Sequence, residues 1–230
     1  MKKIIITQSN YIPWKGYFDG IALVDDFVIY DDMQYTKRDW RNRNLIKTPQ
    51  GLKWLTIPVE VKGKYFQKIN ETKISNQNWV EDHLNQFKQH YKKAAFFNEV
   101  FPWMEDLYLN CKFDLLTHVN QYFLEEINQY LNIKTRFHRS EDFILMEDRT
   151  ERLLNICINL EATHYVSGPA AKAYMNEALF EKNNIQINYL DYTGYNPYNQ
   201  MYGDFEHGVP IFDLLLNEGK KSKHFLKFIQ

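Results

Sequence analysis

The sequence predicts an α/β fold, in which a mostly parallel sheet is built from N- and C-terminal βα units, with an inserted helical subdomain and a short β-ribbon. Three observations predict it. Strand-like runs alternate with helical spacing near the N-terminus, the same alternation returns near the C-terminus, and helical spacing dominates the middle. Because 44% of the 230 residues are hydrophobic, one substantial core is expected. We therefore expect a single domain over residues 1–230, with residues 76–146 a mainly helical insertion.

The first unit begins with three isoleucines, Ile4 to Ile6, which predict a short buried strand. A polar turn over residues 7–10 follows, and a Pro-Trp segment then leads into a helix that ends near Val24. Residues 27–30 predict the second strand. Strand, helix and strand form a βαβ unit, whose crossover is expected to be right-handed.

The C-terminal half repeats this alternation. Residues 149–160 have helical spacing, residues 163–166 predict a strand, residues 170–182 a helix and residues 185–190 another strand. The longest irregular stretch is expected over residues 192–202. Both ends of the chain are therefore predicted to contribute parallel strands.

The middle of the chain predicts a ribbon and helices. Residues 52–61 are extended in character but include Pro58, which is typical of a sheet edge or a β-ribbon. Beyond them, apolar residues recur every three or four positions, as on one face of a helix. They are Val80, Leu84, Phe87 and Tyr91 in one segment and Leu116, Val119, Phe123, Ile127 and Tyr130 in another. Two or three amphipathic helices are therefore expected.

Charge and cysteine content argue against several classes of protein. Lysine and arginine total 28 against 29 acids, so the chain has no large net positive charge that would attract it non-specifically to nucleic acids or membranes. The two cysteines have no C-x-x-C spacing and predict neither a disulfide framework nor a structural metal. No run approaches the roughly 20 apolar residues of a membrane span, so we expect a cytoplasmic protein without membrane insertion.

The loop after the first strand is the first candidate binding segment, because ligands of open α/β sheets sit at the carboxyl ends of strands. Gln8 ends that strand, Gly16 allows a close approach of the chain, and Tyr11, Trp14 and Tyr17 offer stacking surfaces. Alternatively, the segment is a proline-led helix start whose aromatic side chains enter the core. It contains neither a Walker nor a classical dinucleotide-binding pattern.

The loop after the second strand carries cations interleaved with amides and a tryptophan. Arginine forks match phosphate geometry, and an indole ring can stack on a base or sugar. The sequence therefore predicts a site for a diphosphate or carboxylate. The predicted contacts are Lys37, Arg38, Trp40, Arg41, Asn42 and Arg43.

Acidic side chains open this second loop. Asp31 or Asp32 is a candidate general base or a partner for a hydroxyl or amine, with Gln34 beside them as a further catalytic candidate. The alternative is that one acid caps the turn while the other pairs with a nearby arginine.

Two late segments complete the predicted site. Ser167 and Gly168 end a strand and precede a helix, where free backbone donors attract anions, although a plain helix cap explains the same residues. Tyr174 follows in that segment. Tyr198 and Gln200 belong to a polar aromatic loop that either contacts substrate or covers the surface.

Several motifs occur in one order along the chain: QSNYIPWKGYF, YDDMQYTKRDWRNRN, LTIPV, YVSGPAAKAY and FDLLLNEG. In these motifs the sequence resembles the WbqC-like family of bacterial surface-polysaccharide gene clusters. The resemblance implies work on nucleotide-linked sugars for O-antigen or similar glycans. Such proteins usually read His-Gln-Pro where this chain has Thr7, Gln8 and Ser9, so a mechanism that needs a histidine at position 7 is not implied.

From the residues and the resemblance together, we expect a transferase that places an acyl or aminoacyl group on the amine of a nucleotide-diphosphate sugar, specifically a deoxyamino sugar. An activated acyl or aminoacyl donor is implied, and aminoacyl-tRNA is one form that it can take. Two alternatives stay open: a nucleotidyltransferase-like enzyme that activates a small acid or sugar, and a non-catalytic carbohydrate-binding or scaffold protein. The oligomeric state is open.

Overall fold

A computed structural model of the chain describes residues 1–229 and confirms the α/β class. Its main sheet has five strands in the order β5-β2-β1-β6-β7, and every neighbouring pair is parallel. A separate two-stranded antiparallel ribbon pairs β3 with β4. The strands are β1 (Lys3–Thr7), β2 (Asp26–Ile29), β3 (Arg43–Thr48), β4 (Gly51–Thr56), β5 (Arg136–Arg139), β6 (His164–Ser167) and β7 (Gln186–Tyr189).

The central strand β1 is buried on both faces, which explains its unbroken isoleucine run. Ile5 belongs to a core cluster that includes helix α1 (Lys15–Ala22). Ile4 and Ile6 point to the opposite face, into a cluster with helix α5 (Arg149–Asn159) and helix α6 (Glu177–Glu181). Helices therefore cover the two faces of the sheet.

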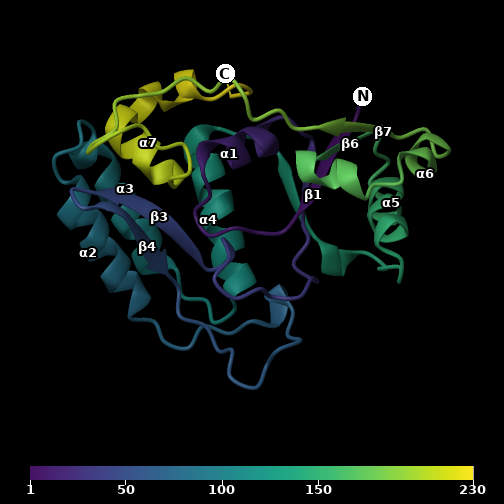
Figure 1. Ribbon diagram of the computed structural model, residues 1–230, viewed down its shortest axis with the longest axis horizontal. Helices are drawn as coiled ribbons and strands as arrows, with labels where there is room; N and C mark the ends of the chain where they lie inside the picture. Colours follow the sequence, from purple (N-terminus) through teal and green to yellow (C-terminus); the bar gives the residue numbers. More distant parts are fainter. Residues whose placement is uncertain (230) are drawn as a thin grey trace.

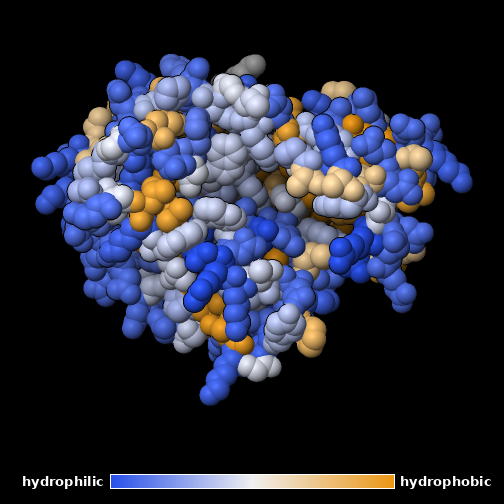
Figure 2. Space-filling model, viewed as in Figure 1, coloured by the Kyte–Doolittle hydropathy of each residue, from blue (hydrophilic) through white to orange (hydrophobic). Residues whose placement is uncertain are grey.

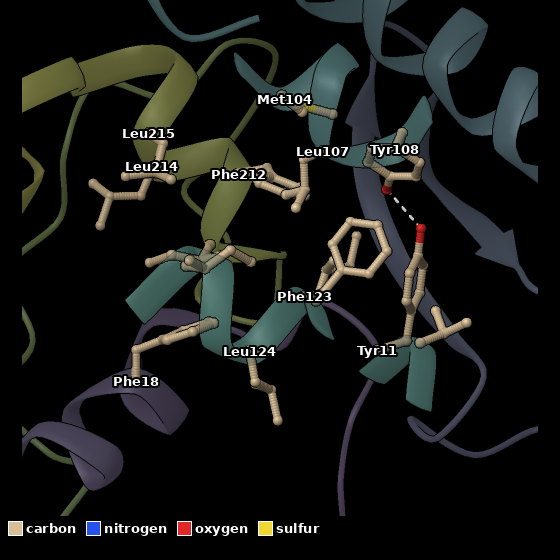
Figure 3. Close-up of a cluster of buried hydrophobic side chains, with 14 of the residues drawn as sticks. Tyr11, Phe18, Met104, Leu107, Tyr108, Phe123, Leu124, Phe212, Leu214 and Leu215 are labelled. Atoms are coloured by element: carbon tan, nitrogen blue, oxygen red, sulfur yellow. Dashed lines mark hydrogen bonds between the residues drawn. The ribbon is translucent and has the colours of Figure 1, made fainter. Parts of the chain in front are cut away.

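A helical layer continues the core away from the sheet, and Figure 1 shows it on the side of the ribbon. Its members are α2 (Trp79–Tyr91), α3 (Phe97–Asn110), α4 (Leu116–Leu131) and α7 (Ile211–Glu218). Elsewhere along the chain are the short 3-10 helices η1 (Ile69–Glu71), η2 (Ser140–Asp142), η3 (Pro169–Ala173) and η4 (Gly219–Phe225). The expected amphipathic helices of the middle segment are α2, α3 and α4. Figure 3 shows Tyr108 of α3, Phe123 of α4 and Phe212 of α7 meeting in one aromatic cluster.

Three segments differ from the sequence-based expectation. The helix predicted over residues 170–182 is interrupted, because Asn176 leaves the helical region at φ −86° and ψ 86° and separates η3 from α6. The extended segment predicted over residues 52–61 ends as a strand at Thr56, and its partner β3 begins at the end of the predicted cationic loop. Strand β5, inside residues 76–146, is an edge strand without an apolar run, so periodicity gave no sign of it.

Within residues 1–229, no helix is both long enough and apolar enough to cross a membrane.

Candidate active site at the carboxyl edge of the sheet

The strand order creates a crevice between β1 and β6. The chain leaves the carboxyl end of β1 toward α1 on one face of the sheet and leaves the carboxyl end of β6 toward α6 on the other, so the two connections diverge between these neighbours. Ligands of open α/β sheets bind at such a switch point. Here the structure has a small, mostly apolar cavity of about 60 Å³, whose lining includes Thr7, Tyr17 and Gly168.

A larger cavity of about 350 Å³ lies beside it, at the start of α1. It is lined by Asn10, Pro13, Trp14, Trp40, Asn44, His207 and Gly208. Trp14 packs against Tyr192 of the smaller cavity with ring centroids 5.2 Å apart, so the two cavities share a wall. Figure 2 shows this face of the molecule hollowed between the sheet side and the ribbon side. A volume of a few hundred Å³ suits a small organic ligand.

Gly16 positions the Trp14 ring. A Cβ at residue 16 would lie 2.3 Å from the indole, so only glycine lets this ring fold back over the first turn of α1. The indole also packs against Tyr192 and Tyr195. Gly16 therefore shapes the cavity through Trp14.

Arg41 joins the cationic loop to the end of β1. Its guanidinium donates to the backbone oxygen of Ser9 at 3.3 Å and to the side chain of Asn10, and it lies 3.8 Å from the Asp39 carboxylate. The side chain is 16% exposed. Asn10 and the neighbouring Trp40 line the larger cavity, so Arg41 lies beside that cavity without lining it.

The other cations of the loop point elsewhere. Arg43 stacks on Trp54 of the ribbon, with its guanidinium carbon 3.8 Å from the ring centroid, and donates to the Arg38 carbonyl. Lys37 and Arg38 are exposed at the surface. Asn42 is buried and donates to the Ile57 carbonyl at 2.8 Å, where the loop enters the ribbon. The structure therefore divides the predicted cluster into one cation at the crevice and a group on the ribbon.

Asp31 is buried beneath the loop that follows β1. Its carboxylate accepts hydrogen bonds from the Ser9 amide at 2.8 Å, the Ser9 hydroxyl at 2.6 Å and the Thr117 hydroxyl at 2.6 Å. Burial raises the pKa of Asp31 above its usual value, although these hydrogen bonds act in the opposite direction. Asn120 of α4 donates both to the Ser9 hydroxyl and to the Arg41 carbonyl. Asp31 therefore fixes the loop that Arg41 contacts.

Asp32 and Gln34 lie farther along the edge, at the end of β2. The Asp32 carboxylate pairs with Lys68 at 2.6 Å and with Arg152 of α5 at 3.5 Å. Gln34 is exposed and donates to the Tyr65 carbonyl at 2.9 Å. Neither residue lines either of the two cavities.

Tyr11 and Tyr17 have different environments despite their shared motif. Tyr11 is fully buried in the core rather than at the crevice, and its hydroxyl bonds to Tyr108 at 2.6 Å (Figure 3). The same hydroxyl lies 2.8 Å from Nδ1 of His83. Tyr17 lines the smaller cavity and donates to the Gln8 carbonyl at 2.9 Å. Burial raises the pKa of Tyr17, which therefore stays a neutral hydrogen-bonding group.

The two late segments predicted to belong to the site differ in whether they line a cavity. Gly168 lines the smaller cavity, Ser167 beside it is buried, and Tyr174 is 70% exposed. Tyr198 donates to the buried carboxylate of Asp213 at 2.6 Å, and Gln200 donates to the Tyr198 hydroxyl at 3.0 Å. Tyr198 and Gln200 thus belong to a network that anchors the irregular segment to α7.

The comparison with known proteins agrees with the resemblance seen in the motifs. The family model described as the WbqC-like protein family matches residues 8–225. The chain belongs to the WbqC-like family. An uncharacterized protein of Mycobacterium tuberculosis is 49% identical over 228 residues, which covers 99% of each chain. No solved structure matches the chain.

In this WbqC-like chain, two residues near the cavities were missed by sequence reasoning. His207 lines the larger cavity, and burial together with the nearby Lys15 ammonium lowers the pKa of its imidazole. Lys15 is 3% exposed, donates to the Asn196 carbonyl at 2.9 Å, and has its pKa lowered to about 8 by burial. No motif links His207 to Trp14, because the two are brought together only by the fold.

The WbqC-like chain has no group of three or more histidine, cysteine, aspartate or glutamate side chains placed to hold a metal ion, as far as residues 1–229 are concerned.

Proposed function

We propose that this protein transfers an acyl or aminoacyl group to the amine of a nucleotide-linked deoxyamino sugar. The observation that carries the proposal is the junction of two cavities at the switch point of the sheet. Trp14 lies in the shared wall, Trp40 lines the larger cavity, and Arg41 donates to Asn10 in the wall of that larger cavity. The switch point is where α/β folds bind nucleotides. Family membership supports a role in glycan biosynthesis, and the motif resemblance points to nucleotide-linked sugars.

Arg41 is the proposed diphosphate ligand. A guanidinium binds a phosphate through two parallel hydrogen bonds, and a partly buried one is less screened by water. Its contacts with Ser9 and Asn10 hold it at the carboxyl end of β1 before any ligand arrives. Trp14 and Trp40 offer rings on which the base or sugar can pack.

His207 is the proposed proton acceptor. Its lowered pKa keeps the imidazole neutral near pH 7, so it can take the proton that the sugar amine loses as it attacks the donor carbonyl. Asp31 is better assigned as a positioning residue, because three protein donors already occupy its oxygens. Asp32 keeps a proposed role in holding Lys68 and Arg152 at the crevice edge.

The test is to incubate the protein with a panel of nucleotide-linked deoxyamino sugars and activated acyl donors and to follow the sugar nucleotide by mass spectrometry. We expect one sugar nucleotide to gain the mass of the acyl group, and the His207→Gln variant to bind that sugar but modify it far more slowly. If no sugar nucleotide binds at millimolar concentration and none gains mass, the proposal is wrong. Tight sugar binding without turnover would instead indicate a non-catalytic carbohydrate-binding protein.

A second candidate, nucleotidyl transfer, is favoured by the same strand order, because the crevice between β1 and β6 also suits a nucleoside triphosphate. Magnesium-dependent release of pyrophosphate would distinguish this activity from acyl transfer. Thr7 ends β1 at the position where a histidine mechanism would need its imidazole, which counts against this candidate.

A further inference from the structure

The outer face of the ribbon carries partly exposed aromatic and cationic side chains near the loop that precedes it. In the β3–β4 register, Ile46 and Leu55 face inward and are buried, whereas Leu45 and Trp54 form a directly opposed pair on the other face. Trp54 is 41% exposed, and so is Trp40 in the preceding loop. Adjacent exposed indoles form a contiguous apolar patch, and such patches often mark binding surfaces.

The two indoles and a guanidinium form one surface. The ring centroids of Trp40 and Trp54 are 5.4 Å apart with an interplanar angle of 46°, and the Arg43 guanidinium lies 3.8 Å from the Trp54 centroid. Lys37 and Arg38 are exposed in the same turn. These five residues are called the ribbon platform below.

The ribbon platform is locally positive. Asp39 is the only acid among residues 37–43, and its carboxylate is engaged by the Trp40 amide at 2.7 Å and by Arg41 at 3.8 Å. Across the described part of the chain, no ion pair includes Lys37, Arg38 or Arg43. Since the whole chain has a formal charge of −1, this positive charge is a local feature that an anionic ligand can complement.

We propose that the ribbon platform binds the single-stranded 3′ end of an aminoacylated RNA, which is the donor for the proposed transfer. Single-stranded nucleic acids bind where aromatic rings accept stacked bases and nearby cations accept phosphates. Trp40 belongs both to the platform and to the wall of the larger cavity, so a strand stacked on the ribbon ends beside that cavity. This inference rests on the proposed function and names its donor.

The chemistry balances without a further reactant. The amine nitrogen of the sugar attacks the ester carbonyl carbon and forms a C–N bond, while the C–O bond to the ribose breaks. His207 takes the proton that the amine loses and returns it to the departing ribose oxygen, which leaves as a hydroxyl. The products are an amide-linked sugar nucleotide and an uncharged RNA.

The first experiment measures fluorescence anisotropy of a 5′-labelled single-stranded RNA of about 12 nucleotides, with an RNA duplex and heparin as competitors. We expect saturable binding that the duplex and heparin displace poorly. Trp54→Ala should weaken it roughly 10-fold or more, because one stacked base is lost, and Trp54→Phe should restore most of it. Phe66→Ala, which removes an aromatic side chain that is 82% exposed elsewhere, and Lys220→Ala, which removes a lysine side chain that is 91% exposed, are matched controls expected to change nothing.

A second measurement keeps this inference separate from the proposed function. The Trp54→Ala variant should bind nucleotide-linked sugar as the unmodified protein does, and the sugar should gain an aminoacyl mass only when aminoacylated RNA is supplied. Absence of RNA binding, or binding that heparin and duplex displace equally and Trp54→Ala leaves unchanged, overturns the RNA inference. If acyl transfer from another donor persists in that case, the proposed function stands without it.

Discussion

Substitution of Asp31 tests whether this residue positions the loop or takes part in catalysis, because a positioning role predicts a large loss of folding stability. The carboxylate accepts three hydrogen bonds from Ser9 and Thr117 at 2.6 to 2.8 Å in a buried site. The Asp31→Ala variant leaves those donors without their acceptor. Each buried donor that stays unpaired lowers the free energy of unfolding by about 1 to 3 kcal/mol. Part of this loss is offset because the carboxylate no longer has to be desolvated. We expect the free energy of unfolding to fall by about 3 to 5 kcal/mol.

Urea unfolding followed by tryptophan fluorescence measures this loss. Asp32→Ala is the matched control, because Asp32 pairs with a Lys68 side chain that is 45% exposed, and partly exposed ion pairs contribute about 1 kcal/mol or less. Equal losses in the two variants would refute the reasoning. So would an Asp31→Ala variant of full stability and no activity, which would make Asp31 a catalytic residue.

The pH dependence of stability gives a second check on Asp31. Burial raises the folded-state pKa of Asp31 above the ordinary value of 3.8, so the folded protein binds this proton more tightly than the unfolded chain does. The stabilisation from this group is fully present below pH 3.8 and is lost as the pH rises through the raised pKa. The stability of wild type relative to Asp31→Asn should therefore decrease with rising pH in that window, and an increase would contradict the assignment.

The remaining predictions concern the cavities. Arg41→Ala should weaken nucleotide-sugar binding, measured by calorimetry, by about 2 to 5 kcal/mol. Lys37→Ala is the control and should change the binding free energy by roughly 1 kcal/mol or less. Equal losses in the two variants would show that Arg41 does not bind the ligand. His207→Gln should lower turnover by about 10² to 10⁴ with affinity unchanged, and the wild-type rate should fall as the pH drops through the lowered pKa of His207, below its ordinary 6.5. A rate that is independent of pH there would exclude His207 as the base. Gly16→Ala should lower the free energy of unfolding by roughly 1 to 3 kcal/mol through its clash with Trp14, and an unchanged melting temperature would contradict that packing.

The sheet was predictable where strands are buried on both faces. The isoleucines of β1 and the apolar residues of β2 form short continuous runs, which is how parallel strands appear in a sequence. The edge strand β5 reads Arg-Phe-His-Arg and has no such run, so its place depends on pairing with β2 and not on its own pattern. The ribbon strand β3 was hidden for a similar reason, because its first residues are polar and belong to the cationic segment.

The candidate site was predictable only in its location. Two strand ends, at Gln8 and Gly168, do meet at one edge of the sheet. The direction of each side chain was not predictable, because Arg41 and Arg43 are two residues apart yet contact Ser9 and Trp54 respectively. His207 lies in an irregular segment far from the first loop in the sequence. That segment is held in place by hydrogen bonds of Tyr198 and Gln200 around Asp213, which do not form a recognisable sequence motif.

The central claim, that ligand binds where the two cavities meet, is tested most directly by hydrogen–deuterium exchange with and without a nucleotide-linked deoxyamino sugar. The structure predicts slower exchange in residues 8–14, 40–44, 168–173 and 207–208, because each of these segments contains residues that line one of the two cavities. Protection confined to the separate groove lined by Lys73, Lys112 and His118, or no protection at a saturating concentration, would contradict it.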